Sequence, residues 1–321
     1  MRIAILISLL PLIGFAQGPY APPAGQFGTS AIHKDSSAFV AWATACVVNR
    51  SWMDIADTAL GLASVGTEAD AVDKAGVNGI VSLGDAGEAI LTFDDPIFDG
   101  PGPDFAIFEN SFSDTYLELA FVEVSSDGIN YFRFDAVSLN QDTLQIDGFG
   151  SVEPTNLYNL AGKYRAQYGT PFDLAEMNGI SGLDINNITH VKVIDVVGSI
   201  NPQYARYDSQ GNAINDPYET PFPSSGFDLD AVGVIHQMVS VNEIKDAIKC
   251  YPNPTSGALN ITLNTNKDRS FELIGISGKR VKSWTSQNAI QIIDCSDLTP
   301  GIYFLSVIEN QIKTVKRIQV L

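Results

Sequence analysis

The chain has 321 residues, of which 45% are hydrophobic, and its formal net charge at pH 7 is −18. Residues 18–240 hold 30 acidic and 8 basic side chains, whereas residues 241–321 hold 7 acidic and 10 basic ones. This acidic excess excludes nucleic acid and anionic membrane surfaces as expected partners. The hydrophobic content argues against disorder. The acids suit divalent cations, or simple solubility outside the cell.

The N-terminus predicts a secretory signal peptide at residues 1–17. Arg2 supplies a positive charge, residues 3–15 are apolar, and Ala16-Gln17 offers a cleavage point. The apolar run is too short to span a membrane, and no other stretch approaches about 20 apolar residues. We therefore expect an exported protein without a transmembrane segment.

The next part of the chain is expected to begin with helix and to continue as short strands. Residues 36–62 are Ala-rich with apolar residues at helical spacing, so one or two amphipathic helices are predicted there. From residue 80 onward, short β-type runs alternate with turn formers. The predicted strands are Ile80–Leu83, Ala89–Phe93, Phe105–Phe108, Leu117–Ser125, Tyr131–Phe134, Val191–Val197 and Phe227–Ile235.

One short helix is predicted among these strands. In Thr170-Pro171-Phe172-Asp173, Thr170 is the expected N-cap and Pro171 the first helical residue, and the helix should run through Met177. Many short strands without long helices between them favour a mainly β fold, an antiparallel β-sandwich at residues 18–235, over a parallel α/β sheet.

The C-terminal 72 residues carry a specific motif. A segment opens with Cys250-Tyr251-Pro252-Asn253-Pro254-Thr255-Ser256-Gly257, and a second block begins at Leu298-Thr299-Pro300-Gly301-Ile302-Tyr303. The motif residues are Tyr251, Pro252, Asn253, Pro254, Gly257, Leu298, Pro300, Gly301 and Tyr303. This segment resembles the type A C-terminal sorting domain of the Bacteroidota type IX secretion system. The resemblance implies an address label that the outer-membrane secretion machinery binds, and hence a secreted or cell-surface protein.

This sorting segment, residues 250–321, should form its own small β-sandwich after a linker at residues 236–249. Its predicted strands are Leu259–Leu263, Phe271–Ile274, Gln291–Ile293, Ile302–Val307 and Val315–Val320. Cys250 and Cys295 both belong to it and either pair or remain free thiols; sequence alone leaves both states open. Cys46, in an apolar stretch, is expected to be a small buried residue.

A second resemblance concerns the larger part of the chain. The blocks are Ala59-Leu60-Gly61, Phe121-Val122-Glu123-Val124-Ser125-Ser126-Asp127-Gly128 and Phe227-Asp228-Leu229-Asp230-Ala231-Val232-Gly233. They resemble signature turns of discoidin-like, galactose-binding-type jelly rolls, and also a group of uncharacterised exported bacterial proteins. Leu62-Ala63 stands where the pattern has Pro-Asp. The resemblance implies a jelly-roll-like sandwich and an exported location.

Four acids lie on predicted strands in register with apolar residues: Glu109, Asp195, Asp228 and Asp230. Asp228 and Asp230 are expected to share a face with the valines that follow them. Carboxylates on apolar faces are costly unless they are neutralised, hydrogen-bonded or bound to a cation. Oxygen ligands outside the cell favour calcium, so a structural calcium site is one interpretation. The other is that these acids cap strand ends or pair with bases such as Arg133, Lys163 and Arg165.

A weaker calcium candidate is the loop at residues 207–217, through Asp208, Asn212 and Asp216. It lacks the alternating register and the final bidentate Glu of a calcium loop, so a solvated turn is the competing interpretation.

Catalysis has less support than binding. No GxSxG, HExxH or CxxC motif occurs, and the histidines, His33, His190 and His236, are scattered. Tyrosines in expected loops favour a glycan site, because their rings stack on sugar faces. These tyrosines are Tyr116, Tyr131, Tyr158, Tyr164, Tyr168, Tyr204, Tyr207 and Tyr218.

The preferred interpretation is a non-catalytic, calcium-stabilised β-sandwich that binds a glycan or another extracellular ligand. Two alternatives stay open. One is an extracellular polysaccharide hydrolase that uses a pair of the four acids, and the other is an accessory protein for adhesion or uptake at the cell surface.

Overall fold

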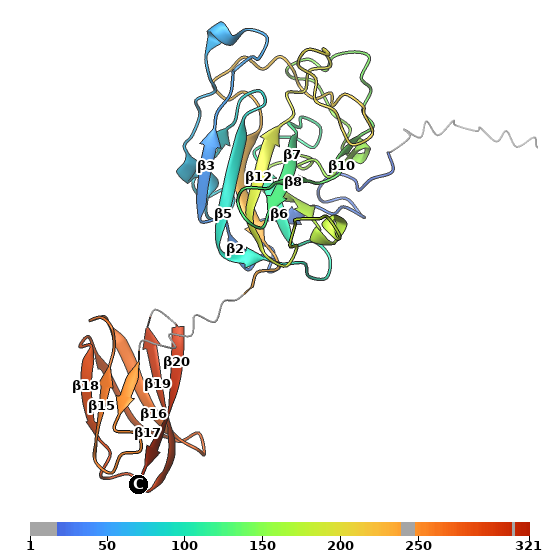
Figure 1. Cartoon of the computed structure of the whole chain (residues 1–321). Coiled ribbons are helices and arrows are strands. Elements are labelled where there is room, and N and C mark those ends of the chain that lie inside the picture. Colours follow the sequence, from blue (N-terminus) through green and yellow to red (C-terminus); the bar gives the residue numbers. More distant parts are fainter. Residues whose placement is uncertain (1–17, 239–247, 310–311) are drawn as a thin grey trace, which may run out of the picture. The chain divides into compact units, whose positions relative to one another are not determined.

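The computed structural model describes residues 18–238, 248–309 and 312–321 and divides the chain into two compact units, Met1–Val239 and Ser240–Leu321 (Figure 1). The predicted signal peptide at residues 1–17 lies outside the described residues. So does most of the predicted linker, since residues 239–247 are not described. Each unit is described by itself.

The first unit is built from two antiparallel sheets. The first sheet has the order β1-β11-β6-β13-β2, with β4 also paired to β13. Its strands are β1 (Ile32–His33), β2 (Ala41–Trp42), β4 (Val81–Ser82), β6 (Phe105–Glu109), β11 (Tyr168–Phe172) and β13 (Asp228–Val234). The second sheet has the order β3-β5-β12-β7-β8 and is labelled across the unit in Figure 1. Its strands are β3 (Ala45–Asn49), β5 (Glu88–Ile97), β7 (Ala120–Ser125), β8 (Phe132–Arg133) and β12 (Ile188–Asp195).

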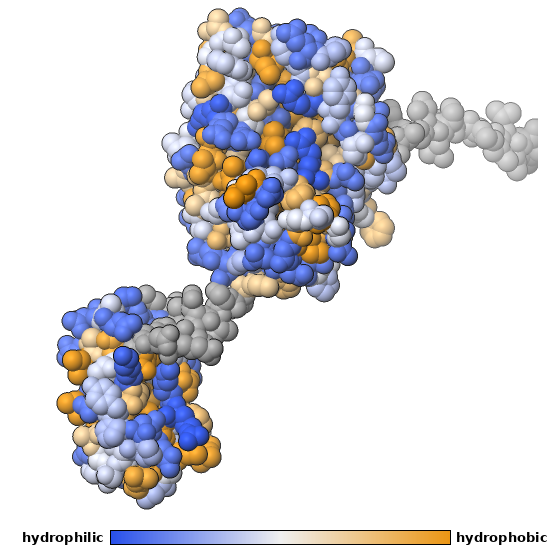
Figure 2. Space-filling model, in the orientation of Figure 1, coloured by the Kyte–Doolittle hydropathy of each residue, from blue (hydrophilic) through white to orange (hydrophobic). Residues whose placement is uncertain are grey.

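Small elements complete this unit. Strands β9 (Val137–Ser138) and β10 (Leu157–Tyr158) pair with each other. The helical segments of the described residues are short 3₁₀ turns: η1 (Thr58–Leu60), η2 (Glu68–Ala71), η3 (Pro154–Asn156) and η4 (Leu174–Met177). On the visible surface, hydrophobic and hydrophilic residues are interspersed (Figure 2).

The core lies between the two sheets because each strand turns alternate residues inward. Phe105 and Ile107 of β6 pack in one cluster with Val122 and Val124 of β7 and with Val191 of β12. The predicted antiparallel β-sandwich is therefore confirmed, and all seven strands expected between residues 80 and 235 are present with shifted bounds.

The amphipathic helices expected at residues 36–62 are wrong. The segment contains β2, β3 and the single turn η1 instead. In β3, Cys46 is buried while Ala45 and Val47 are exposed, which is the two-residue period of a strand. The two adjacent valines favour a strand, and pairing with β5 along the whole of β3 outweighs the Ala content.

The predicted helix start at Thr170 is also wrong. Thr170 and Pro171 belong to β11, where they pair with β6. Proline is tolerated there because β1 pairs only with the first two residues of β11, which leaves one side of the strand free at Pro171. The helical turn begins later, and the Asp173 side chain caps it by accepting a hydrogen bond from the Ala175 N–H at 2.9 Å.

The second unit is a smaller sandwich, as predicted. One sheet has the order β14-β15-β18 and the other β17-β16-β19-β20. The strands are β14 (Lys249–Tyr251), β15 (Ala258–Thr262), β16 (Arg269–Gly275), β17 (Arg280–Ser286), β18 (Ile290–Asp294), β19 (Gly301–Glu309) and β20 (Ile312–Val320). Leu259, Ile261, Phe271, Leu273 and Leu305 are fully buried between the sheets. Cys250 and Cys295 are free thiols, as is Cys46.

The first motif block of this unit is attached to its last strand. The Asn253 amide donates to the Arg317 carbonyl at 2.9 Å, and its oxygen accepts from the Gln319 N–H at 2.8 Å. The Thr255 N–H donates to the Gln319 carbonyl at 2.9 Å. Asn253 thus pairs with β20 much as a strand residue would. In the second block, the Tyr303 hydroxyl closes the turn before β19 by donating to the Thr299 carbonyl at 2.8 Å.

Asp195, at the end of β12, ties three separate segments of the first unit together. Its carboxylate accepts hydrogen bonds from the N–H groups of Ala86 at 2.8 Å, Val197 at 2.8 Å and Phe227 at 2.9 Å. Ala86 and Val197 have φ angles of 62° and 68°, which are unfavourable for residues with a Cβ and especially for valine. Asp195 therefore holds strained backbone in place and joins β12 to the start of β13.

We expect Asp195→Ala to destabilise the first unit by roughly 4 kcal/mol, because it leaves buried N–H groups without an acceptor. Urea unfolding of the full chain, followed through the transition of the first unit, measures this effect. The exposed Asp94 of β5 provides the matched control, and Asp94→Ala should change stability by less than about 0.5 kcal/mol. A loss for Asp195→Ala no larger than the control's would refute the role of Asp195 as a tie.

Candidate functional site

The first unit buries many acids and almost no bases. Nine carboxyl side chains are buried: Asp54, Asp85, Asp104, Glu109, Glu118, Asp195, Asp208, Asp216 and Asp230. In the described part of this unit, Lys163 is the single buried base, and its ammonium donates to the Leu157 carbonyl at 2.7 Å. The acids are therefore stabilised mainly by something other than ion pairs.

Main-chain N–H groups take that role for eight of the nine acids. Asp195 accepts from three N–H groups, those of Ala86, Val197 and Phe227, and Asp104 from two, those of Gly100 and Leu174. Each of the other six acids accepts from the N–H group named after it: Asp54 (Ala56), Asp85 (Ile55), Glu109 (Ser111), Asp208 (Ser138), Asp216 (Leu119) and Asp230 (Gly76). Glu118 differs, because within the described residues no group donates a hydrogen bond to its carboxylate. Buried acids without a donor are costly, so Glu118 calls for a functional explanation.

Glu118 lines a cavity of about 260 Å³ in the first unit. Glu109 at the end of β6 and Asp228 at the start of β13 line the same cavity. The loops that follow β6 and precede β13 complete its wall, and the remaining lining residues are Asn110, Ser111, Phe112, Tyr116, Phe149, Thr220, Phe222 and Ser224. The cavity thus combines three carboxyl groups with a largely aromatic and hydroxylic wall.

Aromatic rings follow one another around this cavity. The Phe112 and Tyr116 centroids lie 4.5 Å apart with the rings stacked, Tyr116 lies 6.3 Å from Phe149, and Phe149 lies 5.9 Å from Phe222. Phe112 is 75% exposed, Phe149 72% and Phe222 43%. Exposed rings in sequence beside a cavity offer flat apolar surface to a ligand.

The electrostatics of the three carboxyls favour their neutral forms. Burial raises the pKa of Glu109 well above its usual range, and the Asp228 charge raises it further. Burial does the same for the pKa of Glu118, with added repulsion from Glu109 and Asp228. The pKa of Asp228 rises to about 6, mainly through burial, although a hydrogen bond from the Ser82 hydroxyl opposes the shift. Strongly raised pKa values of neighbouring carboxyls in one cavity are typical of functional sites.

The structure brings together only part of the predicted calcium set. Glu109 and Asp228 share the cavity, whereas Asp195 is fully engaged by three N–H groups and Asp230 accepts from the Gly76 N–H at 2.8 Å. Asp195 does share the inward face of β12 with Val191 and Val193, as its register indicated.

The expected common face of Asp228, Asp230, Val232 and Val234 is wrong. The pairing of β13 with β6 shifts register between Leu229 and Ala231. As a result, Leu229 joins Val232 and Val234 in the main core, while Ala231 packs with Phe108 elsewhere. A one-residue irregularity of this kind reverses the facing of the residues before it.

The loop at residues 207–217 is internally satisfied. Asp208 accepts hydrogen bonds from the N–H groups of Gln210 and Asn212 and from the Asn212 amide. These bonds lower the pKa of Asp208 despite the opposing effect of its burial, which is the largest single influence. Asp216 turns elsewhere and accepts from the Leu119 N–H at 2.9 Å. Asp208 and Asp216 are buried while Ser209, Gln210 and Gly211 are exposed, so the turn is solvated at its tip and the two acids do not form a joint ligand set.

The aromatic and acidic residues that sequence reasoning missed had usable signals. Glu118 falls within the predicted strand Leu117–Ser125, although β7 itself begins only at Ala120, and its two-residue spacing from the buried Ala120 is the signal that could have marked it as buried. Phe112, Phe149 and Phe222 each stand between turn-forming neighbours, in Ser-Phe-Ser, Gly-Phe-Gly and Pro-Phe-Pro. A large apolar side chain held in a turn is a sign of exposure.

The expected loop tyrosines have different fates. Tyr116 lines the cavity described above, and Tyr204 and Tyr218 line a separate one of about 680 Å³. Tyr164 is buried and its hydroxyl lies 2.7 Å from that of Ser30. Tyr131 lies over the Lys192 ammonium at 3.9 Å from the ring centre. The expected aromatic platform therefore consists mainly of phenylalanines.

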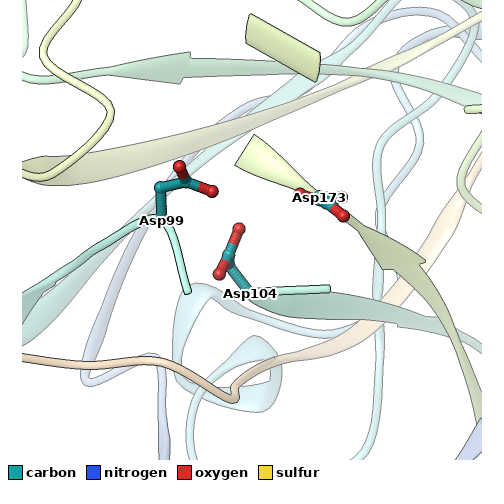
Figure 3. Close-up of side chains that lie close together, drawn as sticks. All are labelled: Asp99, Asp104 and Asp173. Atoms are coloured by element: carbon teal, nitrogen blue, oxygen red, sulfur yellow. The ribbon is translucent and has the colours of Figure 1, made fainter. Parts of the chain in front are cut away.

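A second acidic cluster lies between β5 and β6 (Figure 3). Carboxylate oxygens of Asp99, Asp104 and Asp173 lie within 4.8 Å of one another. Pairing of β6 with β11 brings Asp173 beside the other two across 70 residues of sequence. Asp104 is fully buried and bound by the His236 ring at 2.7 Å, so this histidine belongs to the packed unit and not to a linker. Oxygen Oδ1 of Asp99 is buried and accepts no hydrogen bond.

We expect the stability of the first unit to fall as pH rises from about 5 to about 8 when a chelator is present. Carboxyls with a raised pKa bind protons more tightly in the folded than in the unfolded chain. Their stabilisation is complete below about 4, the usual carboxyl range, and is lost as pH passes the folded pKa. Asp228, with a pKa of about 6, and Asp195, Glu109 and Glu118, also raised by burial, set this window.

Differential scanning calorimetry of the full chain measures the effect. The second unit serves as an internal control, because hydrogen bonds lower the pKa values of its Asp294 and Glu309. Its transition should not fall over the same range. A first transition that rises with pH would contradict the expectation.

Comparison with known proteins identifies the second unit. Residues 249–321 match the family described as the secretion system C-terminal sorting domain. No curated protein matches the chain. In the described residues, no helix has the length and apolar character needed to cross a membrane.

Solved structures give only distant likenesses. PorZ, a surface component of the type IX secretion system of Porphyromonas gingivalis, is 15% identical over 29% of this chain and 14% of its own, with a TM-score of 0.22. The BSP domain of a biofilm-associated protein is 12% identical over 79% and 53%, with a TM-score of 0.22. A Ruminococcus gnavus β-glucuronidase is 10% identical over 78% and 39%, with a TM-score of 0.21. This chain covers about half or less of each, and at such scores the likenesses carry no argument.

The sorting motif, the β-sandwich that contains it and the family match all identify the second unit as a sorting domain. The motif residues Asn253 and Tyr303 occupy structural positions within the domain that the family match covers. Residues 249–321 are a type IX secretion C-terminal sorting domain, and the chain is a cargo protein exported to the cell surface or beyond it.

Proposed function

We propose that the first unit is a non-catalytic binding module that holds an extracellular glycan in the cavity lined by Glu109, Glu118 and Asp228. The observation that carries the proposal is the run of exposed rings beside buried carboxyls in one cavity. Flat rings stack on the apolar faces of sugars, while carboxyl oxygens accept hydrogen bonds from sugar hydroxyls.

The size of the cavity limits what enters it. About 260 Å³ lies at the lower end of ligand-site volumes, so the cavity takes one small unit of a larger molecule. The exposed rings of Phe112 and Phe149 then contact neighbouring units outside it. A ligand with one unit in the cavity and further units on the rings is a polymer, such as an extracellular polysaccharide.

We expect Phe149→Ala to weaken glycan binding by roughly 3- to 10-fold, because one stacking interaction contributes about 0.5–1.5 kcal/mol. A glycan array with the full chain selects the ligand, and titration calorimetry then compares the variants. Phe27 is also exposed, more so than Phe149, and is absent from the cavity lining, so Phe27→Ala is the control and should bind like the unaltered chain. Equal weakening by both substitutions, or no glycan bound at all, would contradict the proposal.

Hydrolysis is a second candidate with one observation in its favour. Burial and the Asp228 charge raise the pKa of Glu109 well above its usual range, and a carboxyl of raised pKa beside a second carboxyl is what glycoside hydrolysis requires of its general acid. Release of reducing ends from the selected glycan, abolished by Glu109→Gln and Asp228→Asn, would replace the binding module by an enzyme.

Calcium stabilisation is proposed at a different place from the one that the sequence favoured. Asp99, Asp104 and Asp173 offer oxygens at close range, and Asp99 Oδ1 has no competing hydrogen bond. Asp104 and Asp173 also accept hydrogen bonds from N–H groups, so the unpaired Asp99 Oδ1 is what distinguishes this cluster from Asp195 and Asp208.

Calcium at about 100 times its Kd should raise the melting temperature of the first unit by roughly 5–10 °C over the chelated protein. Asp99→Asn should remove most of this rise, and Asp94→Asn should retain it. Melting curves of the full chain with calcium or chelator provide the measurement. An unchanged melting temperature would exclude calcium, and a full rise in Asp99→Asn would exclude this site.

A further inference from the structure

The charge around the cavity of Glu109, Glu118 and Asp228 is one-sided. Its lining contains these three acids and no lysine, arginine or histidine. An adjoining cavity that shares Ser111 and Phe112 contains His33 and Arg165, and Arg165 is paired with Asp114 at 3.2 Å. The cavity therefore has no cation of its own to balance the carboxyls.

Glu118 lacks a hydrogen-bond donor among the described residues. It is only 8% exposed, it lines the cavity, and it alone among the nine buried acids of the first unit accepts no hydrogen bond from the described residues. Glu109 and Asp228 have one or two donors each and retain free lone pairs. A bound group must bring several donors to satisfy this set.

A protonated primary amine meets the requirement better than a hydroxyl does. It has three N–H donors and a positive charge, whereas a hydroxyl has one donor and no charge. The rings of Tyr116 and Phe149 beside the cavity add attraction for a cation through their π faces. The same rings still stack on the sugar ring that carries the amine.

We propose that the cavity selects glycans with a free amino group, whose ammonium lies among Glu109, Glu118 and Asp228. This inference rests on the proposed glycan-binding function and names its substrate class. Acetylation of the amine removes its charge and two of its donors, so the N-acetylated form of the same sugar is the discriminating comparison.

Proton release accompanies such binding. In the empty cavity, burial and repulsion from neighbouring acids raise the pKa values of Glu109 and Glu118 well above the usual range and favour their protonated forms. The charged groups that act most strongly on these two pKa values are acidic: Asp195, Asp216, Asp228 and Asp230. An ammonium stabilises the ionised carboxyls, so protons leave as it binds and affinity rises with pH while the amine stays protonated.

The test compares two matched oligosaccharides on the full chain by titration calorimetry. At a pH of about 6, where amines are protonated, the tetramer of glucosamine should bind at least 10-fold more tightly than the tetramer of N-acetylglucosamine. Titrations in two buffers of different ionisation enthalpy should show net proton release. Glu118→Gln should remove the preference for the glucosamine tetramer over the N-acetylglucosamine tetramer.

Controls separate ligand recognition from folding. Asp94→Asn removes an exposed charge outside the cavity and should keep the full preference. Because Glu118 has no donor to lose, Glu118→Gln should keep or raise the melting temperature, which a structural role would not allow. Tetralysine carries ammonium groups without sugar rings and should bind at least 10-fold more weakly than the glucosamine tetramer.

The failures are distinguishable. Equal affinity for the two tetramers overturns the selection for amines and leaves glycan binding standing. Equal affinity for tetralysine overturns the requirement for a sugar. Absence of binding to the glucosamine tetramer overturns this inference, while the array of the preceding section decides separately whether the cavity binds any glycan.

Discussion

The first unit depends on one recurring interaction, the hydrogen bond from a main-chain N–H to a buried carboxylate. Eight acids use it, and Asp195 uses it three times at the point where β12, the loop before β5 and the start of β13 meet. A buried carboxylate is unfavourable alone, but amides aimed at it replace the lost water. The loops supply these N–H groups only when they are folded, so folding of the loops and stabilisation of the buried carboxylates occur together. This explains how a chain with so few bases buries so many acids.

Glu118 is the exception among these buried acids, because it lacks an N–H donor from the described residues. Glu118 is buried by the same loops, yet no amide is aimed at it. Residues that weaken a fold without local compensation are commonly those that bind something. The contrast with Asp195 is informative, because both acids are buried and their donors differ. Asp195, at the end of the central strand β12, accepts three N–H bonds, whereas Glu118, just before β7, accepts none from the described residues. Asp195 serves the fold, and Glu118 is free to serve a ligand.

Alternation along strands made much of this arrangement predictable. It predicted that Glu109 and Asp195 lie in register with buried apolar residues of β6 and β12, and both acids are buried. It failed at β13, where a register shift that no single-strand pattern reveals turns Leu229 inward in place of Asp228. The cluster of Asp99, Asp104 and Asp173 was out of reach, since it exists only because β6 pairs with β11. Helix was expected at β3 because local composition omits the partner strand that decides the matter.

The choice of main-chain donors also shapes how freely such a protein can change over evolutionary time. A side-chain donor is lost by most substitutions, whereas an amide is supplied by every amino acid except proline. Leu119, Leu174 and Phe227 can therefore be exchanged without removing the bonds to Asp216, Asp104 and Asp195. The acids themselves have no such freedom. Lineages descended from a common ancestor should thus keep a sparse set of invariant carboxylates within loops that otherwise diverge, with proline alone barred from the donating positions.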